Sequence, residues 1–391
     1  MKTRLIGLGL FMLTAATVIL FPVLKSSATT RVQPPPLNNG AEIEVVFVLD
    51  TTGSMGGLIA TAKEKIWSIA TTMAQANQAP RISMGLVAYR DRGDSYVTQV
   101  VDLSTDLDSM YASLMDFAAD GGGDGPESVN QALHDAVHKV SWSQNPNSYQ
   151  AIFLVGDAPP HMDYQDELKY PAIVAAARSK GIRVNAIQCG NVAQTTPIWT
   201  EIARLGDGRY LQVEQAGGAV AVATPFDADL ATLSAALDET RVYYGSAEEL
   251  AQSESKLAAT DKLQELASVA SRARRAIFNA TASGAASLFG ERELLEDVAS
   301  GRVDVSDIPA SELPEPLRVL PKEEQAAAIE AGLKRRAELQ QRITELGAQR
   351  DDYLASELDG QARDSLDVQL YEIVREQAAP KGLVYDAGPQ F

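Results

Sequence analysis

The residues that could carry chemistry lie in one short stretch, Asp50-Thr51-Thr52-Gly53-Ser54. Thr52 and Ser54 are two residues apart in a turn that Gly53 permits, so their hydroxyls can face one point together with the Asp50 carboxylate. Carboxylate and hydroxyl oxygens suit Mg²⁺ or Mn²⁺. Because two neutral hydroxyls neutralise less of the cation's charge than two carboxylates would, the ion would stay electrophilic. The stretch therefore predicts a site for one divalent cation.

This stretch lies between a predicted strand and a predicted helix. Residues 43–49 (IEVVFVL) form an almost continuous apolar run, which is typical of a strand buried on both faces of a parallel sheet. Helical and strand patterns then alternate as far as residue 240. This alternation predicts an α/β fold, a doubly wound and mainly parallel sheet with helices on both faces. Ligands of such sheets bind beyond the carboxyl ends of the strands, where Asp50 lies.

Residues 42–241 resemble the von Willebrand factor A domain family. That family has an Asp-x-Ser-x-Ser pattern after its first strand, and Thr52 stands where the pattern has its first Ser. Residues 151–157 (AIFLVGD) are similar to the family's fourth strand, which ends in an Asp that reaches the metal through water. The resemblance thus implies that Asp157 is the second carboxylate of the site.

The third loop of the family usually offers a Thr, and residues 121–127 (GGGDGPE) contain none. The resemblance places either Gly123 or Asp124 at the equivalent position, and Asp124 is the predicted ligand. A carboxylate there would lower the residual charge of the ion and weaken its capture of an acidic group. The full set of predicted metal ligands is Asp50, Thr52, Ser54, Asp124 and Asp157.

The resemblance implies a protein-interaction module for adhesion or assembly, in which Mg²⁺ or Mn²⁺ binds an acidic side chain of a protein partner. Three alternatives remain open at this stage. Asp50 could cap the following helix while the hydroxyls satisfy loop amides, with no metal. Asp50 could serve a metal-assisted phosphoryl hydrolase. The domain could also be a metal-free scaffold that forms oligomers through its C-terminal helices.

The N-terminal segment predicts export. Lys2 and Arg4 precede an apolar run over residues 5–24, and Ser26-Ser27-Ala28 supplies small residues of the type that precede signal-peptide cleavage. Residues 1–28 are therefore a signal peptide or an uncleaved membrane anchor. In either case the rest of the chain is expected in the periplasm or cell envelope.

The remaining organisation follows from composition. Residues 29–41 are rich in Pro and Asn and predict a stiff linker. Residues 242–391 predict a mostly helical region, with an apolar stripe in residues 322–358 that indicates a helical hairpin or a short coiled coil. The stripe is expected to pair with a helix at residues 365–377 or to pack back on residues 247–278. The 34 Lys and Arg against 52 Asp and Glu give a net charge of −18, which disfavours nucleic acid as a partner. Cys189 is the single cysteine, so no intramolecular disulfide can form.

Two minor candidates lie near the predicted site. His161 follows Asp157 in its loop and is expected to bond to the backbone. The tripeptide Arg92-Gly93-Asp94 matches an integrin-binding signal, and it is predicted to be an ordinary loop.

Overall fold

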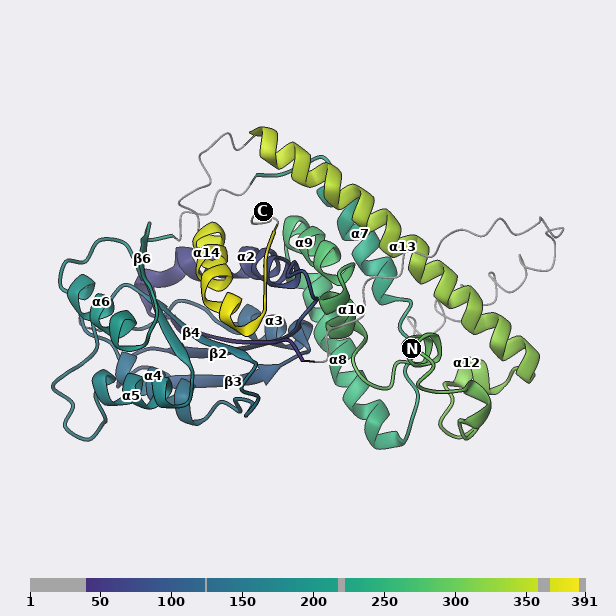
Figure 1. Ribbon diagram of the computed structural model, residues 1–391, viewed down its shortest axis with the longest axis horizontal. Coiled ribbons are helices and arrows are strands. Elements are labelled where there is room, and N and C mark those ends of the chain that lie inside the picture. Colours follow the sequence, from purple (N-terminus) through teal and green to yellow (C-terminus); the bar gives the residue numbers. More distant parts are fainter. Residues whose placement is uncertain (1–39, 124, 217–221, 358–365, 387–391) are drawn as a thin grey trace.

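A sheet domain and a helical region lie side by side in the computed structural model, which describes residues 40–123, 125–216, 222–357 and 366–386 (Figure 1). The predicted signal peptide or anchor, nearly all of the predicted linker, and Asp124 lie outside these residues. Within the described ranges, no helix is long and apolar enough to cross a membrane.

The sheet has the strand order β3-β2-β1-β4-β5-β6, with β1 parallel to both β2 and β4. The edge strand β3 is antiparallel to β2, and the other pairs are parallel. All residues of the central strand β1 are buried, because helices cover both faces of the sheet. This arrangement confirms the predicted α/β fold. The strands are β1 (Glu42–Asp50), β2 (Arg81–Tyr89), β3 (Thr98–Ser104), β4 (Tyr149–Gly156), β5 (Arg183–Cys189) and β6 (Tyr210–Val213).

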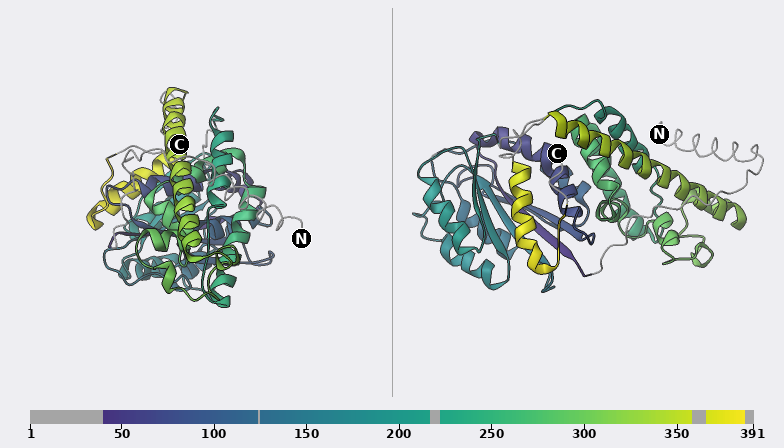
Figure 2. Two further views of the ribbon diagram at one scale, coloured as in Figure 1. Left: turned by 90° about the vertical axis from the view of Figure 1, so that its right-hand side faces the viewer. Right: turned by 45° about the horizontal axis from the view of Figure 1, so that its top comes forward.

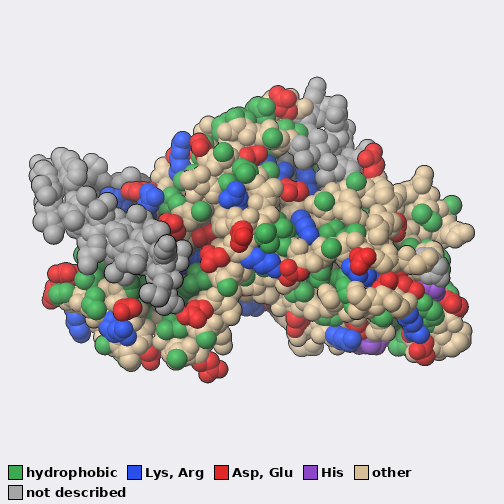
Figure 3. Space-filling view, turned by 180° about the vertical axis from the view of Figure 1, so that it is seen from behind, with side chains coloured by type: hydrophobic (Ala, Val, Ile, Leu, Met, Phe, Trp, Pro, Cys, Tyr) green, Lys and Arg blue, Asp and Glu red, His purple; other side chains and the backbone are tan. Residues whose placement is uncertain are grey.

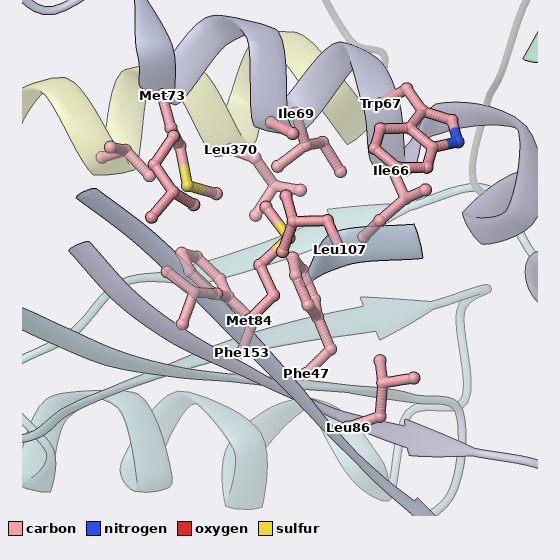
Figure 4. Packing of buried hydrophobic residues seen from close by; sticks show 14 of the residues in the cluster. Phe47, Ile66, Trp67, Ile69, Met73, Met84, Leu86, Leu107, Phe153 and Leu370 are labelled. Carbon is pink, nitrogen blue, oxygen red and sulfur yellow. The ribbon is translucent and has the colours of Figure 1, made fainter. Parts of the chain in front are cut away.

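Two hydrophobic clusters separate the helices of the sheet domain into two layers. Helices α4, α5 and α6 pack on one face of the sheet, and α2, α3 and α14 pack on the other. Figure 4 shows part of the second layer, with Leu370 of α14 beside Ile69 and Met73 of α2. The elements are η1 (Gly53–Met55), α2 (Gly56–Ala74), α3 (Leu107–Asp116), α4 (Val129–His138), α5 (Tyr170–Ser179), α6 (Thr195–Leu205) and α14 (Leu366–Ala378).

Helix α14 belongs to the sheet domain in space, although about 150 residues separate it from β6 in sequence (Figures 1 and 2). The Tyr149 hydroxyl of β4 donates to Gln377 Oε1 at 2.8 Å, and Gln377 Nε2 donates to Asn185 Oδ1 of β5 at 2.8 Å. Leu370 and Ile373 are buried in the same core. The sequence left two partners open for residues 322–358, a hairpin with this segment or packing on residues 247–278. The hairpin does not form, because the apolar face of α14 fits the sheet face beside α2. Packing on residues 247–278 is observed, since Ile343 and Leu346 share a hydrophobic cluster with Ala273 and Ala276.

The helical region runs from α7 to α13 and lies between β6 and α14 in sequence. Helix α7 packs on α9 and α13, so the helix that begins at Asp227 contacts the helical region although the predicted boundary lay at residue 241. The apolar stripe of α13, which includes Ile343 and Leu346, is buried against this region. It is therefore covered within the chain. The helices are α7 (Asp227–Asp238), α8 (Ala247–Leu266), α9 (Val269–Asn279), α10 (Ala282–Phe289), α11 (Leu294–Ala299), α12 (Glu315–Arg318) and α13 (Lys322–Glu357), with η2 (Val305–Asp307) and η4 (Ala379–Lys381) as short 3₁₀ turns.

A buried charge cluster joins the two parts. Arg275 of α9 donates through Nε to Asp108 Oδ1 of α3 at 2.7 Å, and through Nη2 to Asp238 Oδ1 of α7 at 2.8 Å. Thr260 of α8 donates to Asp108 Oδ2 at 2.7 Å. Side chains of four helices therefore meet in this cluster. On the surface, by contrast, acidic and basic side chains are interspersed, as on the face in Figure 3.

Candidate metal centre

Asp50 is the last residue of β1, and its side chain is fully buried at the carboxyl end of the sheet. Its Oδ1 accepts hydrogen bonds from the backbone N–H of Thr52 at 2.9 Å and from Thr52 Oγ1 at 2.6 Å. Its Oδ2 is buried and has no hydrogen-bond partner among the described residues. A buried polar atom that lacks a partner is costly, so Oδ2 is the atom that a cation would satisfy.

The two hydroxyls of the motif lie together as the spacing predicted. Thr52 Oγ1 and Ser54 Oγ are 3.5 Å apart, and Ser54 is exposed to solvent. The Gly53 N–H donates to the Gly121 carbonyl at 3.1 Å, which ties this turn to the third loop. Asp50 organises the turn by accepting from Thr52 through Oδ1, and it does not cap a helix as the metal-free alternative proposed, because neither η1 nor α2 has a side-chain cap. This leaves Oδ2 for another role.

Asp157 follows β4 and lies near Asp50. The two strand ends approach closely at Gly156, where a Cβ would lie 2.9 Å from Asp50 Cβ and 2.5 Å from the Tyr89 hydroxyl. Asp157 Oδ2 accepts a hydrogen bond from Gln215 Nε2 at 2.7 Å. Sequence reasoning missed Gln215, because the segment after β6 carries no motif that would single it out. Its contact with Asp157 exists only because β6 ends at the same edge of the sheet.

Glu127 is a further acidic side chain of the site that the sequence did not identify as a candidate. Its backbone is fixed to the loop after β4, since its N–H donates to the Pro159 carbonyl at 2.9 Å and its carbonyl accepts from the His161 N–H at 3.1 Å. The residue is 4% exposed, and its Oε2 has no hydrogen-bond partner in the described part of the chain. Asp124, the predicted third-loop ligand, lies outside the described residues.

Two buried carboxyl groups of the site favour their neutral, protonated form. Burial raises the pKa of Asp50 to about 7, and the charge of Asp157 adds to this increase. Burial also raises the pKa of Glu127 to about 9, with further contributions from Asp50, Asp91 and Asp94. A divalent cation could take the place of the protons that these two carboxyls otherwise retain.

These raised pKa values predict that the metal-free protein becomes less stable as the pH rises. Between about pH 4 and pH 7 the unfolded chain releases the Asp50 proton that the folded chain keeps, so folding binds a proton and stability falls. Glu127 should extend this loss towards about pH 9. Urea unfolding in EDTA at several pH values should show a shallower decline from pH 4 to 7 for Asp50→Asn than for the unchanged protein. Equal slopes would contradict the assignment.

The neighbouring polar residues have structural partners. The Asp94 carboxylate accepts from the Gly122 N–H at 3.1 Å, so it is engaged with the neighbouring third loop, as in an ordinary loop contact. Asp91 accepts from Ser128 Oγ at 2.8 Å and from the Tyr164 hydroxyl at 2.9 Å. His161 Nδ1 lies 2.8 Å from Asp163 Oδ1, so its side chain bonds to a carboxylate where a backbone partner was expected.

The residues present fit a cation bound by mixed oxygen ligands. In the described ranges no three His, Cys, Asp or Glu side chains are grouped to hold a metal ion by themselves. Binding would therefore require the hydroxyls of Thr52 and Ser54 beside the free Asp50 Oδ2, with water completing the shell. Mg²⁺ accepts such a set, because it usually retains several waters in protein sites.

A mixed six-stranded sheet whose first strand ends in this oxygen-rich turn defines an α/β module with its site at the carboxyl ends of the strands. Residues 44–224 match the von Willebrand factor A domain family, so this part of the chain is a von Willebrand factor A domain. Such domains are generally protein-interaction modules and are usually not catalytic.

Two curated proteins are similar to part of the chain. A putative ariadne-like RING finger protein of Acanthamoeba polyphaga mimivirus is 27% identical over 125 residues, which are 32% of this chain and 12% of that protein. The alpha-protein kinase vwkA of Dictyostelium discoideum is 27% identical over 120 residues, or 30% of this chain and 19% of the kinase. The chain thus spans less than a fifth of either relative.

Solved structures are also similar to part of the chain. An aerotolerance-related membrane protein from Bacteroides fragilis is 17% identical, with a TM-score of 0.31 over 44% of this chain and 92% of that one. The SpRpn10 VWA domain is 16% identical, with a TM-score of 0.34 over 44% of this chain and 88% of that one.

Proposed function

We propose that the von Willebrand factor A domain binds one Mg²⁺ or Mn²⁺ ion at Asp50, Thr52 and Ser54, and through it holds an acidic side chain of a protein partner. The observation that carries this proposal is the buried Asp50 Oδ2, which has no hydrogen-bond partner among the described residues. Ser54 is exposed beside it, so the site opens to solvent where a partner could approach. Asp157 adds a second carboxylate.

The chemistry of such a contact is electrostatic. A bound divalent ion supplies positive charge at the surface of a chain whose net charge is −18. Asp50 and the two hydroxyls hold the ion, Gln215 orients Asp157 from the side, and the turn at Gly53 keeps the hydroxyls together. The contact requires no bond to be made or broken in the partner.

The proposal extends to location. The apolar run of residues 5–24, behind two basic residues, supports export to the periplasm or cell envelope. The partner would then be another exported or envelope protein. Pull-down from an envelope fraction with and without EDTA, followed by identification of proteins that depend on the ion, tests this location and the type of partner together.

Divalent cations should stabilise the protein measurably. At about 100 times the dissociation constant, Mn²⁺ or Mg²⁺ should add roughly 2.7 kcal/mol to the free energy of unfolding, by mass action. A thermal melt should show the rise as an increase in Tm of a few degrees. The double variant Asp50→Ala, Ser54→Ala should show no such increase. An equal increase in both proteins would mean that the ion binds elsewhere.

A further inference from the structure

We infer that Glu127 is the third-loop ligand of the cation, in the role that the family assigns to a Thr and that the sequence suggested for Asp124. This inference rests on the proposed function and names a residue that the loop pattern alone did not. It begins from two buried carboxylate oxygens, Asp50 Oδ2 and Glu127 Oε2, which both lack a hydrogen-bond partner among the described residues.

The position of Gly122 shows that Glu127 reaches the ligand turn. A Cβ at Gly122 would lie 3.1 Å from Glu127 Oε1 and 3.0 Å from Thr52 Cβ. The Glu127 carboxylate and the Thr52 side chain therefore flank the same point. Gly122 itself has a φ of 79°, in the region where a side chain is strained, so the backbone stays bare between these two groups.

The backbone of Glu127 is held in place from two sides. Its backbone forms a bridge with Pro160 of the loop after β4, and helix α4 begins two residues later. A ligand on such a fixed backbone needs little ordering when the ion binds. The neighbouring Asp91 shows the contrast, because donors from Ser128 and Tyr164 already satisfy its carboxylate.

Glu127 would change what the ion can do. Glu127 would add a carboxylate to Asp50 and the nearby Asp157, so it would neutralise the charge of a divalent cation more completely than a Thr in the third loop would. Affinity for the ion should rise, and its attraction for the partner's carboxylate should fall. The domain would then hold its ion tightly and its partner in a weak, exchangeable contact.

Titration of the full chain with Mn²⁺, by calorimetry and by thermal melts, tests this assignment. We expect Glu127→Gln to weaken Mn²⁺ binding at least about tenfold. The same variant should melt within a few degrees of the unchanged protein in EDTA, because Gln matches the size of the neutral Glu127 side chain, so weaker Mn²⁺ binding would not reflect unfolding. Glu44→Gln is the matched control, because Glu44 is a buried carboxylate towards the other end of β1, where Gln150 Nε2 donates to it at 2.7 Å. This control should melt lower and bind Mn²⁺ as the unchanged protein does.

The outcomes separate the inference from the proposed function. If the unchanged protein takes up no Mn²⁺, the proposed metal site fails and this inference fails with it. If the unchanged protein binds Mn²⁺ and Glu127→Gln binds it within about twofold, the metal site stands and Glu127 is not its ligand. Weaker Mn²⁺ binding by Glu127→Gln together with unchanged Mn²⁺ binding by Glu44→Gln establishes the assignment.

Discussion

Replacing Arg275 by Met is expected to lower the free energy of unfolding by roughly 3–5 kcal/mol, the usual cost of leaving buried charges without their partner. Arg275 is fully buried and donates to both oxygens of Asp108 and of Asp238. Met fills similar space but provides no donor, so two buried carboxylates would face each other. Urea unfolding followed by circular dichroism measures the loss.

Arg342→Met is the matched control, because Arg342 makes a surface pair with Glu345 in which both side chains are about half exposed. Such pairs contribute roughly 0–1 kcal/mol, so this variant should unfold nearly as the unchanged protein does.

Lowering the pH provides a second test of the Arg275 cluster. Arg275 and its hydrogen bonds hold the pKa of Asp108 well below its usual range, so the stability from this pair is present above about pH 4 and is lost as the pH falls further. A loss below about 1 kcal/mol in Arg275→Met would contradict this view of the cluster.

Ending the chain at Glu357 is expected to unfold the sheet domain, although every strand of the sheet precedes that residue. The truncation removes α14 and the tail that follows it. Four of their buried side chains, Leu370, Tyr371, Ile373 and Val374, lie in the core beside α2. Each such side chain contributes roughly 1.5–3 kcal/mol when buried, so their joint loss of roughly 6–12 kcal/mol is comparable to the roughly 5–15 kcal/mol that stabilises a typical domain.

Soluble yield, far-ultraviolet circular dichroism and limited proteolysis measure this effect. A chain ending at Asp386 is the control, because it keeps α14 and the hydrogen bond from Asn77 N–H to the Val384 carbonyl. We expect the longer chain to resist protease while the shorter one is degraded. Cooperative unfolding of the shorter chain at a similar urea concentration would show that α14 is dispensable.

Local pattern was enough to predict most of the sheet domain. The apolar run at residues 43–49 is β1, and the alternation after it gave the correct order of strands and helices. The same holds for the ligand turn, because Asp50, Thr52 and Ser54 are close in sequence and a single tight turn brings their oxygens together. Interactions within a few residues are visible in sequence because spacing alone determines them.

Contacts between distant segments could not be predicted in this way. Gln215 reaches Asp157, and Glu127 lies beside Thr52, only because parallel strands end at one edge of the sheet. Helix α14 has an apolar stripe that would suit a hairpin with α13 as well as the sheet, and nothing in its own sequence distinguishes these partners.

The sequence by itself therefore determined the α/β fold of the von Willebrand factor A domain, the turn that brings Asp50, Thr52 and Ser54 together, and the helical character of the region after it. Tertiary structure alone decided that α14 completes the sheet domain, that the stripe of α13 packs on α7 and α9, and that Glu127 and Gln215 lie at the candidate site. The physical reason is the distance along the sequence between the residues that interact. Turns and periodicity are set by neighbouring residues, whereas the choice among apolar partners depends on which surface remains uncovered once the whole chain has packed.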